Sequence, residues 1–286
     1  MALKKVKDER FKKAVEQVEN ENKTPLVDES TPVVSDDGFI HGEPMLYGYK
    51  DPETGEMHNT FTYREMDGRD EEAIQKGDVK SNGSKVTNLI VERCVSEIGG
   101  ITKKDLGVKK WGEFIRNLLQ GDLIYMMVKV RKVSKGNIIS FTHKCPNCQT
   151  KLVTEMGIDE LPVTPFPGYT EIPFSLPGRG YRDNHNVYHK EGVLHLMRGV
   201  DSEVVTPLLM KNKAAATTMM LARTIQFDDG TPIFLENIKG MSLKDRDYLS
   251  NLHVENTFGV DVSLDEVYCT SCGHDLSGER FTSDFF

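Results

Sequence analysis

The sequence predicts an α+β fold in which a unit of roughly 100 residues occurs twice. Three observations support this prediction. Alternating apolar and polar residues indicate a hairpin ahead of amphipathic helical runs in both halves of the chain. Each half then ends in a Cys-x-x-Cys tetrad. Landmark residues also follow the same order in the two halves, which is typical of diverged tandem repeats.

The two tetrads occupy residues 145–148 (Cys-Pro-Asn-Cys) and 269–272 (Cys-Thr-Ser-Cys). Each is typical of a knuckle, in which a two-residue turn directs two thiolates at one metal ion. Four sulfur ligands make a closed tetrahedral zinc site, which contributes folding energy and leaves no coordination position open for catalysis. We therefore predict a structural, zinc-ribbon-like Zn2+ site whose ligands are Cys145, Cys148, Cys269 and Cys272.

The separation of the two tetrads is unusual. Cys269 follows Cys148 by 121 positions, whereas a simple zinc ribbon has roughly 15 to 20 residues between its pairs. Two diverged copies, each ending in half a zinc site, explain this separation without an inserted catalytic domain. On that interpretation zinc is a clasp between the copies. We expect the flanking His143 and His274 to hydrogen-bond to metal-bound sulfurs, with replacement of one sulfur ligand as the alternative.

The bulk composition is that of a soluble chain. Of 286 residues, 38% are hydrophobic and 28% are charged, and no apolar run has the roughly 18 residues of a membrane span. The N-terminal stretch MALKKVKDERFKK lacks the apolar core of a signal peptide, so we expect a reducing cytoplasm. There, paired cysteines favour metal binding over disulfides, and Cys94, in an apolar run, is expected to be a buried thiol.

The first copy begins after an amphipathic helix that extends to about residue 22 and an extended linker from 22 to about 43. A hairpin follows, and then a helix capped by Asp67 or Asp70. The remaining elements expected in this copy are a helix over 84–98 that Gly99-Gly100 ends, a long helix over 109–133, and a strand over 137–143.

The second copy repeats these landmarks with shifts that we assign to loop insertions. Another hairpin, around 172–174 and 193–197, leads to Arg198-Gly199-Val200-Asp201, which we align with residues 64–67. The segment 216–226 resembles 86–96, and 244–248 resembles 121–125. The divisions that result are an N-terminal helix and arm (1–43), a first repeat (44–156), a second repeat (157–278) and an aromatic tail (279–286).

Motifs of common enzymes are absent from the sequence: it has no GxxxxGKS loop, no GxSxG elbow and no HExxH helix. Residues 177–180 (Pro-Gly-Arg-Gly) are expected to form a plain turn, and the His-containing run 181–189 a polar hairpin loop. Arg246 is either part of a helix cap or a ligand for a carboxylate on a partner or on the other repeat. Three Phe in the tail predict docking within the chain or on a partner.

The second copy carries the elements Arg198, Asp201, Asp245, Arg246, Phe258-Gly259 and the knuckle at Cys269 and Cys272. In this arrangement the chain from about 44 to 276 resembles the baseplate proteins of T-even-type contractile-tailed bacteriophages, including hub-associated and tail-assembly members. The first copy departs from the pattern, with Gly121-Asp122-Leu123 where the second has Lys244-Asp245-Arg246. The resemblance implies a virion or assembly component without catalytic activity.

We therefore expect a non-enzymatic structural or assembly protein of a phage tail baseplate, with other tail or baseplate proteins as partners. Its expected location is the host cytoplasm during assembly and then the virion. The alternative is a zinc-ribbon nucleic-acid-binding factor, favoured by Lys144 and Lys151 beside one knuckle and by the lysines at 103–104 and 109–110. A net charge of -8 and a pI near 5.6 make nucleic acid the weaker candidate.

Overall fold

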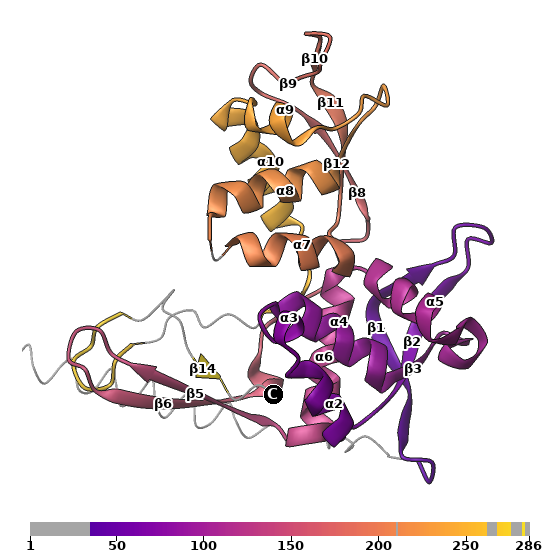
Figure 1. Cartoon of the computed structure of the whole chain (residues 1–286), viewed down its shortest axis with the longest axis vertical. Coiled ribbons are helices and arrows are strands. Elements are labelled where there is room, and N and C mark those ends of the chain that lie inside the picture. Colours follow the sequence, from indigo (N-terminus) through magenta and orange to yellow (C-terminus); the bar gives the residue numbers. More distant parts are fainter. Residues whose placement is uncertain (1–34, 210, 262–267, 276–281, 284–286) are drawn as a thin grey trace, which may run out of the picture. The chain divides into compact units, whose positions relative to one another are not determined.

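The computed structural model describes residues 35–209, 211–261, 268–275 and 282–283 (Figure 1). The helix expected before residue 22 and most of the aromatic tail lie outside these residues. The described chain mixes helices and strands, as an α+β protein does. None of its described helices combines the length and the apolar composition that a membrane crossing requires.

A four-stranded antiparallel sheet opens the first half of the described chain. Its order is β1 (Phe39–Lys50), β2 (Met57–Arg64), β3 (Val95–Ile98) and β4 (Ile101–Thr102). The predicted hairpin is confirmed, since β1 pairs with β2 around a turn at 51–56. The predicted linker is too long, because β1 already begins at Phe39.

Five helices belong to this half: α2 (Gly68–Ile74), α3 (Gly77–Lys80), α4 (Gly83–Cys94), α5 (Lys103–Asn117) and α6 (Gln120–Lys135). Asp67 caps α2, as predicted, in a capping box with Asp70. The helix expected over 84–98 ends at Cys94. Val95 and Ile98, both without solvent exposure, belong to β3, because the apolar run continues into the sheet.

The long helix expected over 109–133 is two helices. Leu118 and Leu119 between them have extended backbone, with ψ angles of 157° and 140°. Their backbone pairs with a segment distant in sequence: Gly199 N–H donates to Leu118 O (3.1 Å) and Gln120 N–H to Met197 O (2.9 Å). Tertiary hydrogen bonds therefore override the helical periodicity of the sequence here.

The second half is built on a three-stranded antiparallel sheet of β12 (Ile225–Phe227), β11 (Glu191–His195) and β8 (Glu171–Ser175). The β9 (Tyr181–Arg182) and β10 (Tyr188–His189) strands form a short hairpin between β8 and β11. The helices are α7 (Gly199–Leu209), α8 (Lys213–Thr224), α9 (Leu235–Lys239) and α10 (Leu243–Glu255).

Each half buries its own apolar cluster. Trp111, Phe61 and Leu123 lie in the first cluster, and the Trp111 indole N–H donates to Glu92 O at 3.0 Å. Phe174 of β8 and Phe227 of β12 lie in the second cluster with side chains of β11, α8 and α10, and Leu119 of the first half also belongs to it. Burial of such side chains supplies the main stabilising free energy of each half.

Polar contacts also join the two halves. Ser84 and Thr206 hydroxyls lie 2.6 Å apart, between α4 and α7. The strands β7 (Val163–Thr164) and β13 (Gly259–Val260) pair next to α6, where Gly259 has a φ of +116° and the Cβ of any other residue would lie 2.8 Å from Gly121 Cα. Only glycine allows that approach and that backbone conformation.

A buried carboxylate holds a hairpin in each half. Asp122, the third residue of α6, accepts N–H bonds from the β1 residues Leu46, Tyr47 and Gly48 at 2.9–3.0 Å. Asp245, the third residue of α10, accepts the N–H groups of Gly178 and Gly180 in the β8–β9 connection. Both carboxylates have no solvent exposure.

A second carboxylate in each half ties two helices together. Asp70 of α2 binds Arg93 of α4, with Nε and Oδ1 2.7 Å apart, and also binds Arg64. Asp201 of α7 binds Arg223 of α8 through the same pair of atoms at 2.7 Å.

Candidate metal centre

The first cysteine pair lies at the closed end of a hairpin of β5 (Ile138–Lys144) and β6 (Lys151–Gly157), where the sequence predicts the strand that enters the knuckle. Cys145 N–H donates to Thr150 O (3.0 Å), and Gln149 N–H donates to Cys145 O (2.9 Å). Gln149 has a φ of 62°, so the chain turns sharply just after Cys148. This turn directs both sulfurs to the same side.

The second pair has the same backbone geometry. Cys269 N–H donates to His274 O (2.8 Å), and Gly273 N–H donates to Cys269 O (2.8 Å). Gly273, which follows Cys272, has a φ of 71°. The isolated bridge between Tyr268 and Asp275 closes this turn as the Lys144–Lys151 pair closes the first.

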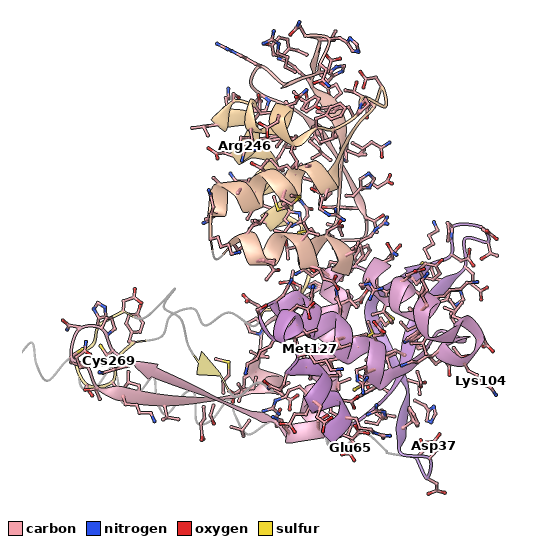
Figure 2. All side chains as sticks on the ribbon, in the orientation of Figure 1. Asp37, Glu65, Lys104, Met127, Arg246 and Cys269 are labelled. Carbon is pink, nitrogen blue, oxygen red and sulfur yellow. The ribbon has the colours of Figure 1, made fainter. Side chains whose placement is uncertain are left out.

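The structure brings the four predicted cysteines together. Cys145 and Cys272 sulfurs are 3.7 Å apart, and Cys148 and Cys269 sulfurs 3.6 Å. All four sulfurs lie within 4.8 Å of one another, and Figure 2 shows Cys269 at the closed end of the β5–β6 hairpin. A tetrahedron of sulfurs about 2.3 Å from a central zinc ion has edges of about 3.8 Å. The four cysteines can therefore hold a metal ion of that kind.

The surroundings of three of the thiols shift their pKa values in different directions. Burial raises the pKa of the Cys145 thiol to about 11. The hydrogen bond between the Cys148 thiol and Thr150 Oγ1, 3.3 Å apart, lowers the pKa of Cys148 to about 6. The His274 backbone and the Asn147 amide, whose Nδ2 donates to Cys272 Sγ at 3.5 Å, lower the pKa of Cys272. These donors stabilise the thiolate form that binds metals.

The expected histidine contacts are met only in part. His274 contacts the cysteines through its backbone: its carbonyl accepts from Cys269 N–H, and a backbone hydrogen bond joins it to Cys272. The side chain of His143 lies outside the described atoms. Cys94 is buried as predicted, with its pKa raised to about 12 by burial and by Asp70.

Other residues that the sequence singles out have structural roles. Arg246 is 9% exposed, and its guanidinium donates to Ile238 O, Ala214 O and Thr218 Oγ1, so it is neither of the two alternatives expected, a solvated helix cap or a ligand for a carboxylate. Residues 177–180 form a turn that Asp245 holds. His189 lies between Asp183 and Asp229, at 3.3 and 2.6 Å, in the polar hairpin.

Sequence reasoning missed the backbone contacts of Asp122 and Asp245, which it treated only as alignment landmarks. An acidic residue in the first turn of a helix is usually exposed, so the sequence does not distinguish these two. Their burial in the structure is what reveals the role.

The chain matches the family model of the T4 bacteriophage base plate protein over residues 49–277. The match covers most of the chain, and the chain belongs to this family. Family membership makes the protein a structural component of a bacteriophage, and it indicates a location in the virion tail. Searches of the curated proteins and of the solved structures give no match.

Proposed function

We propose that the protein is a non-enzymatic structural or assembly component of a phage tail baseplate, with Zn2+ as an internal clasp. The observation that carries this proposal is the approach of four sulfurs from two distant knuckles, inside a chain that belongs to a baseplate family. With four thiolates bound, zinc keeps no position for substrate or water, so its contribution is to folding. Other tail or baseplate proteins are the proposed partners.

Zinc is the proposed metal because the sulfur separations fit its bond lengths and because a four-thiolate set suits a borderline-soft ion. Zinc binding would join residues 145–148 to 269–272 and so fix the C-terminal segment on the β5–β6 hairpin. The proposed ligands remain Cys145, Cys148, Cys269 and Cys272.

We further propose that the two halves are diverged copies of one unit. The matched ion pairs and the matched hairpin carboxylates support it. Asn82 and Asn212 support it as well, since each caps the next helix of its half through its side-chain oxygen.

These contacts favour an alignment that differs from the one expected at the hairpin exit. Asp201 accepts from Arg198 N–H as Asp70 accepts from Asp67 N–H. Asp201 therefore corresponds to Asp70, three positions beyond the Asp67 of the first alignment. The proposed divisions stay at 1–43, 44–156, 157–278 and 279–286.

Zinc content and stability of single cysteine variants test the clasp. Cys145→Ser and Cys269→Ser are each expected to lose the stoichiometric zinc of the full chain and to unfold at lower denaturant concentration. Cys94→Ala is the matched control, because Cys94 is a buried cysteine outside the cluster. If either knuckle variant keeps full zinc and full stability, the two knuckles do not share one ion.

Mass spectrometry of purified particles tests the baseplate role, and the chain is expected among the tail proteins. The rival reading as a nucleic-acid-binding factor has the exposed Lys144 and Lys151 in its favour. It predicts binding to DNA or RNA that weakens steeply with salt. Such binding, together with absence from tail and from tail intermediates, would contradict the proposal.

A further inference from the structure

A seven-residue segment with four identical residues occurs twice in the chain. The shared residues are Met66, Gly68, Asp70 and Glu72 in the segment 66–72, and Met197, Gly199, Asp201 and Glu203 in the segment 197–203. Each segment spans the entry into the first turn of a helix, α2 in the first half and α7 in the second. We call them the first and the second entry segment.

The second entry segment is docked on the first half. Gly199 N–H donates to Leu118 O, and Asn88 Nδ2 donates to Gly199 O (3.1 Å) and to Glu203 Oε1 (2.7 Å). Asn82 Nδ2 donates to Glu203 O at 2.8 Å. The surface formed by α4 and the start of α6 thus binds this segment. Asn82 and Asn88 of this surface hydrogen-bond to the backbone of the segment and to the Glu203 side chain.

The glycine of the second entry segment is required by this docking. A Cβ at Gly199 would lie 2.5 Å from Leu123 Cδ1 and 2.8 Å from Asn88 Oδ1. A Cβ at Gly68 would meet nothing within 4 Å, and Glu72 is exposed. The first entry segment therefore has the same four residues, but within the described part of the chain no surface packs against its glycine.

The second half has a matching surface on which the described residues place no such segment. Asn212 is exposed and caps α8 as Asn82 caps α4, and residues 241–243 lead into α10 as 118–120 lead into α6. Leu118 and Leu119 are 2% and 8% exposed beneath the second entry segment. Met241, which stands where the first half has Leu118, is also buried at 6% exposure, whereas Leu243, in the place of Gln120, is 76% exposed.

Further apolar side chains are exposed in α9 and just before it, since Phe234 and Leu235 are 46% and 40% exposed. An exposed group of large apolar residues marks an interaction surface more often than an isolated one does. We call the surface formed by α8, α9 and the start of α10 the acceptor end.

We propose that the acceptor end binds the first entry segment of a second copy of this chain. The inference rests on the proposed repeat, because the internal docking of residues 197–203 supplies the expected geometry. The charges are partly complementary: Glu65, Glu71 and Glu72 are exposed in and beside the first entry segment, and Lys213 and Lys244 are exposed at the acceptor end, where Lys239 is paired with Glu236 of its own helix. Opposite charges of this kind favour association and set its orientation.

Arg246 makes this contact weaker than the internal one. It stands where the first half has Leu123, and its guanidinium is already bonded to Thr218 and to two carbonyls. A docking segment would therefore pack against the hydrogen-bonded guanidinium of Arg246 rather than against an apolar side chain such as Leu123. The association is therefore expected to be reversible and dependent on concentration.

The donor and the acceptor are different surfaces of one chain, so the contact is heterologous. Such contacts repeat from head to tail and build rings or open chains of subunits instead of closing as a twofold dimer. Single variants that block one surface each can distinguish these outcomes.

The test is sedimentation of the full-length, zinc-loaded chain over a range of concentrations. The wild-type protein is expected to form species beyond a dimer. Gly68→Gln, which puts a side chain where docking needs none, and Leu243→Asp, which charges the acceptor end, are each expected to weaken self-association roughly tenfold or more. A 1:1 mixture of the two variants is expected to form dimers and nothing larger, because each retains the surface that the other lacks.

The matched control is Val254→Asp, at the other end of α10, where Val254 is 70% exposed; it should leave the association unchanged. A wild-type chain that stays monomeric at every concentration overturns the inference, as does self-association that persists in both variants. A mixture that fails to form dimers indicates a twofold contact and overturns it too. Zinc content measured in the same samples separates this result from failure of the proposed clasp.

Discussion

Asp122 and Asp245 occupy the same place in the two halves, yet their surroundings differ. Each is the third residue of a helix and binds backbone N–H groups of a hairpin. Ser242 caps α10, and its hydroxyl donates to Asp245 at 2.7 Å. Leu119 stands at the equivalent position of α6 and offers no side-chain cap.

The difference has a direct structural meaning. The first N–H of α6, from Gln120, is satisfied by Met197 O of the second half. The start of α10 is capped by its own serine. At this point the first half depends on the second for its polar contacts, whereas the second half is self-sufficient. The comparison can be tested with matched pairs of substitutions, starting with the largest expected effect.

Removal of the two hairpin carboxylates should cost unequal free energies of unfolding. Asp122→Ala leaves three backbone N–H groups without an acceptor and is expected to cost about 3 kcal/mol or more. Asp245→Ala leaves two and is expected to cost about 2 kcal/mol. Urea denaturation of the full chain measures both. Equal losses would show that the number of N–H groups held does not set the energy.

The helix-tying carboxylates should differ in the same direction. Asp70 binds two arginines and its side chain is 1% exposed, while Asp201 binds Arg223 and its side chain is 11% exposed. Asp70→Asn is expected to cost about 2–3 kcal/mol and Asp201→Asn about 1–2 kcal/mol. Thermal unfolding of the two variants gives the order. A larger loss for Asp201→Asn would contradict the ranking by burial.

The entry-segment glycines should respond with opposite signs. Gly199→Ala forces a Cβ against Leu123 and is expected to cost about 1–3 kcal/mol. Gly68→Ala has open space and a helical position, so it is expected to be neutral or to stabilise by about 0.5 kcal/mol. Denaturant midpoints of the two variants decide the matter. Destabilisation by Gly68→Ala at concentrations that allow self-association would point to the inferred contact between copies.

The smallest expected effect is a pair of opposite pH dependences. Burial outweighs three N–H bonds and raises the pKa of Asp122, so its contribution to stability falls as pH rises from the unfolded pKa through the folded one. Burial also acts on Asp245, but Ser242 and the two glycine N–H groups outweigh it and lower the pKa of that carboxyl. Its contribution is present above the unfolded pKa and is lost as pH falls through the folded one.

Asp122→Asn and Asp245→Asn isolate these contributions. Between neutral pH and about pH 4, near the unfolded pKa, the cost of Asp122→Asn should grow on acidification. The cost of Asp245→Asn should shrink below that pH. Denaturation from neutral pH down to below the folded pKa of Asp245 measures both slopes, and slopes of the same sign would refute the contrast.

The features that local sequence determines are the ones that sequence reasoning predicted well. The hairpin of β1 and β2 and the Asp67 cap depend on a turn and a capping residue that are local in the chain, and each half of the four-cysteine cluster is recognised from the two-residue spacing within its own pair. The family was also reached from short motifs, and the family match over residues 49–277 confirms it.

The features that depend on distant contacts were missed. The break at Leu118 and Leu119 is invisible to periodicity, because residues 197–199 supply the hydrogen bonds that hold it open. The end of α4 at Cys94 depends on pairing of β3 with β2. The alignment expected from the sequence put Asp201 on Asp67, whereas the N–H contacts of Asp201 match those of Asp70, because a run of acidic residues there offers several similar matches.

The carboxylate of Asp122 has one more consequence. β1 is an outer strand of its sheet, and such a strand presents free backbone donors that invite pairing with another chain. Over Leu46–Gly48 those donors are already bound to a buried side chain, and a charged acceptor shields them from any incoming strand. In a crowded assembly of many chains, these three N–H groups of β1 are not available to pair with a neighbouring strand.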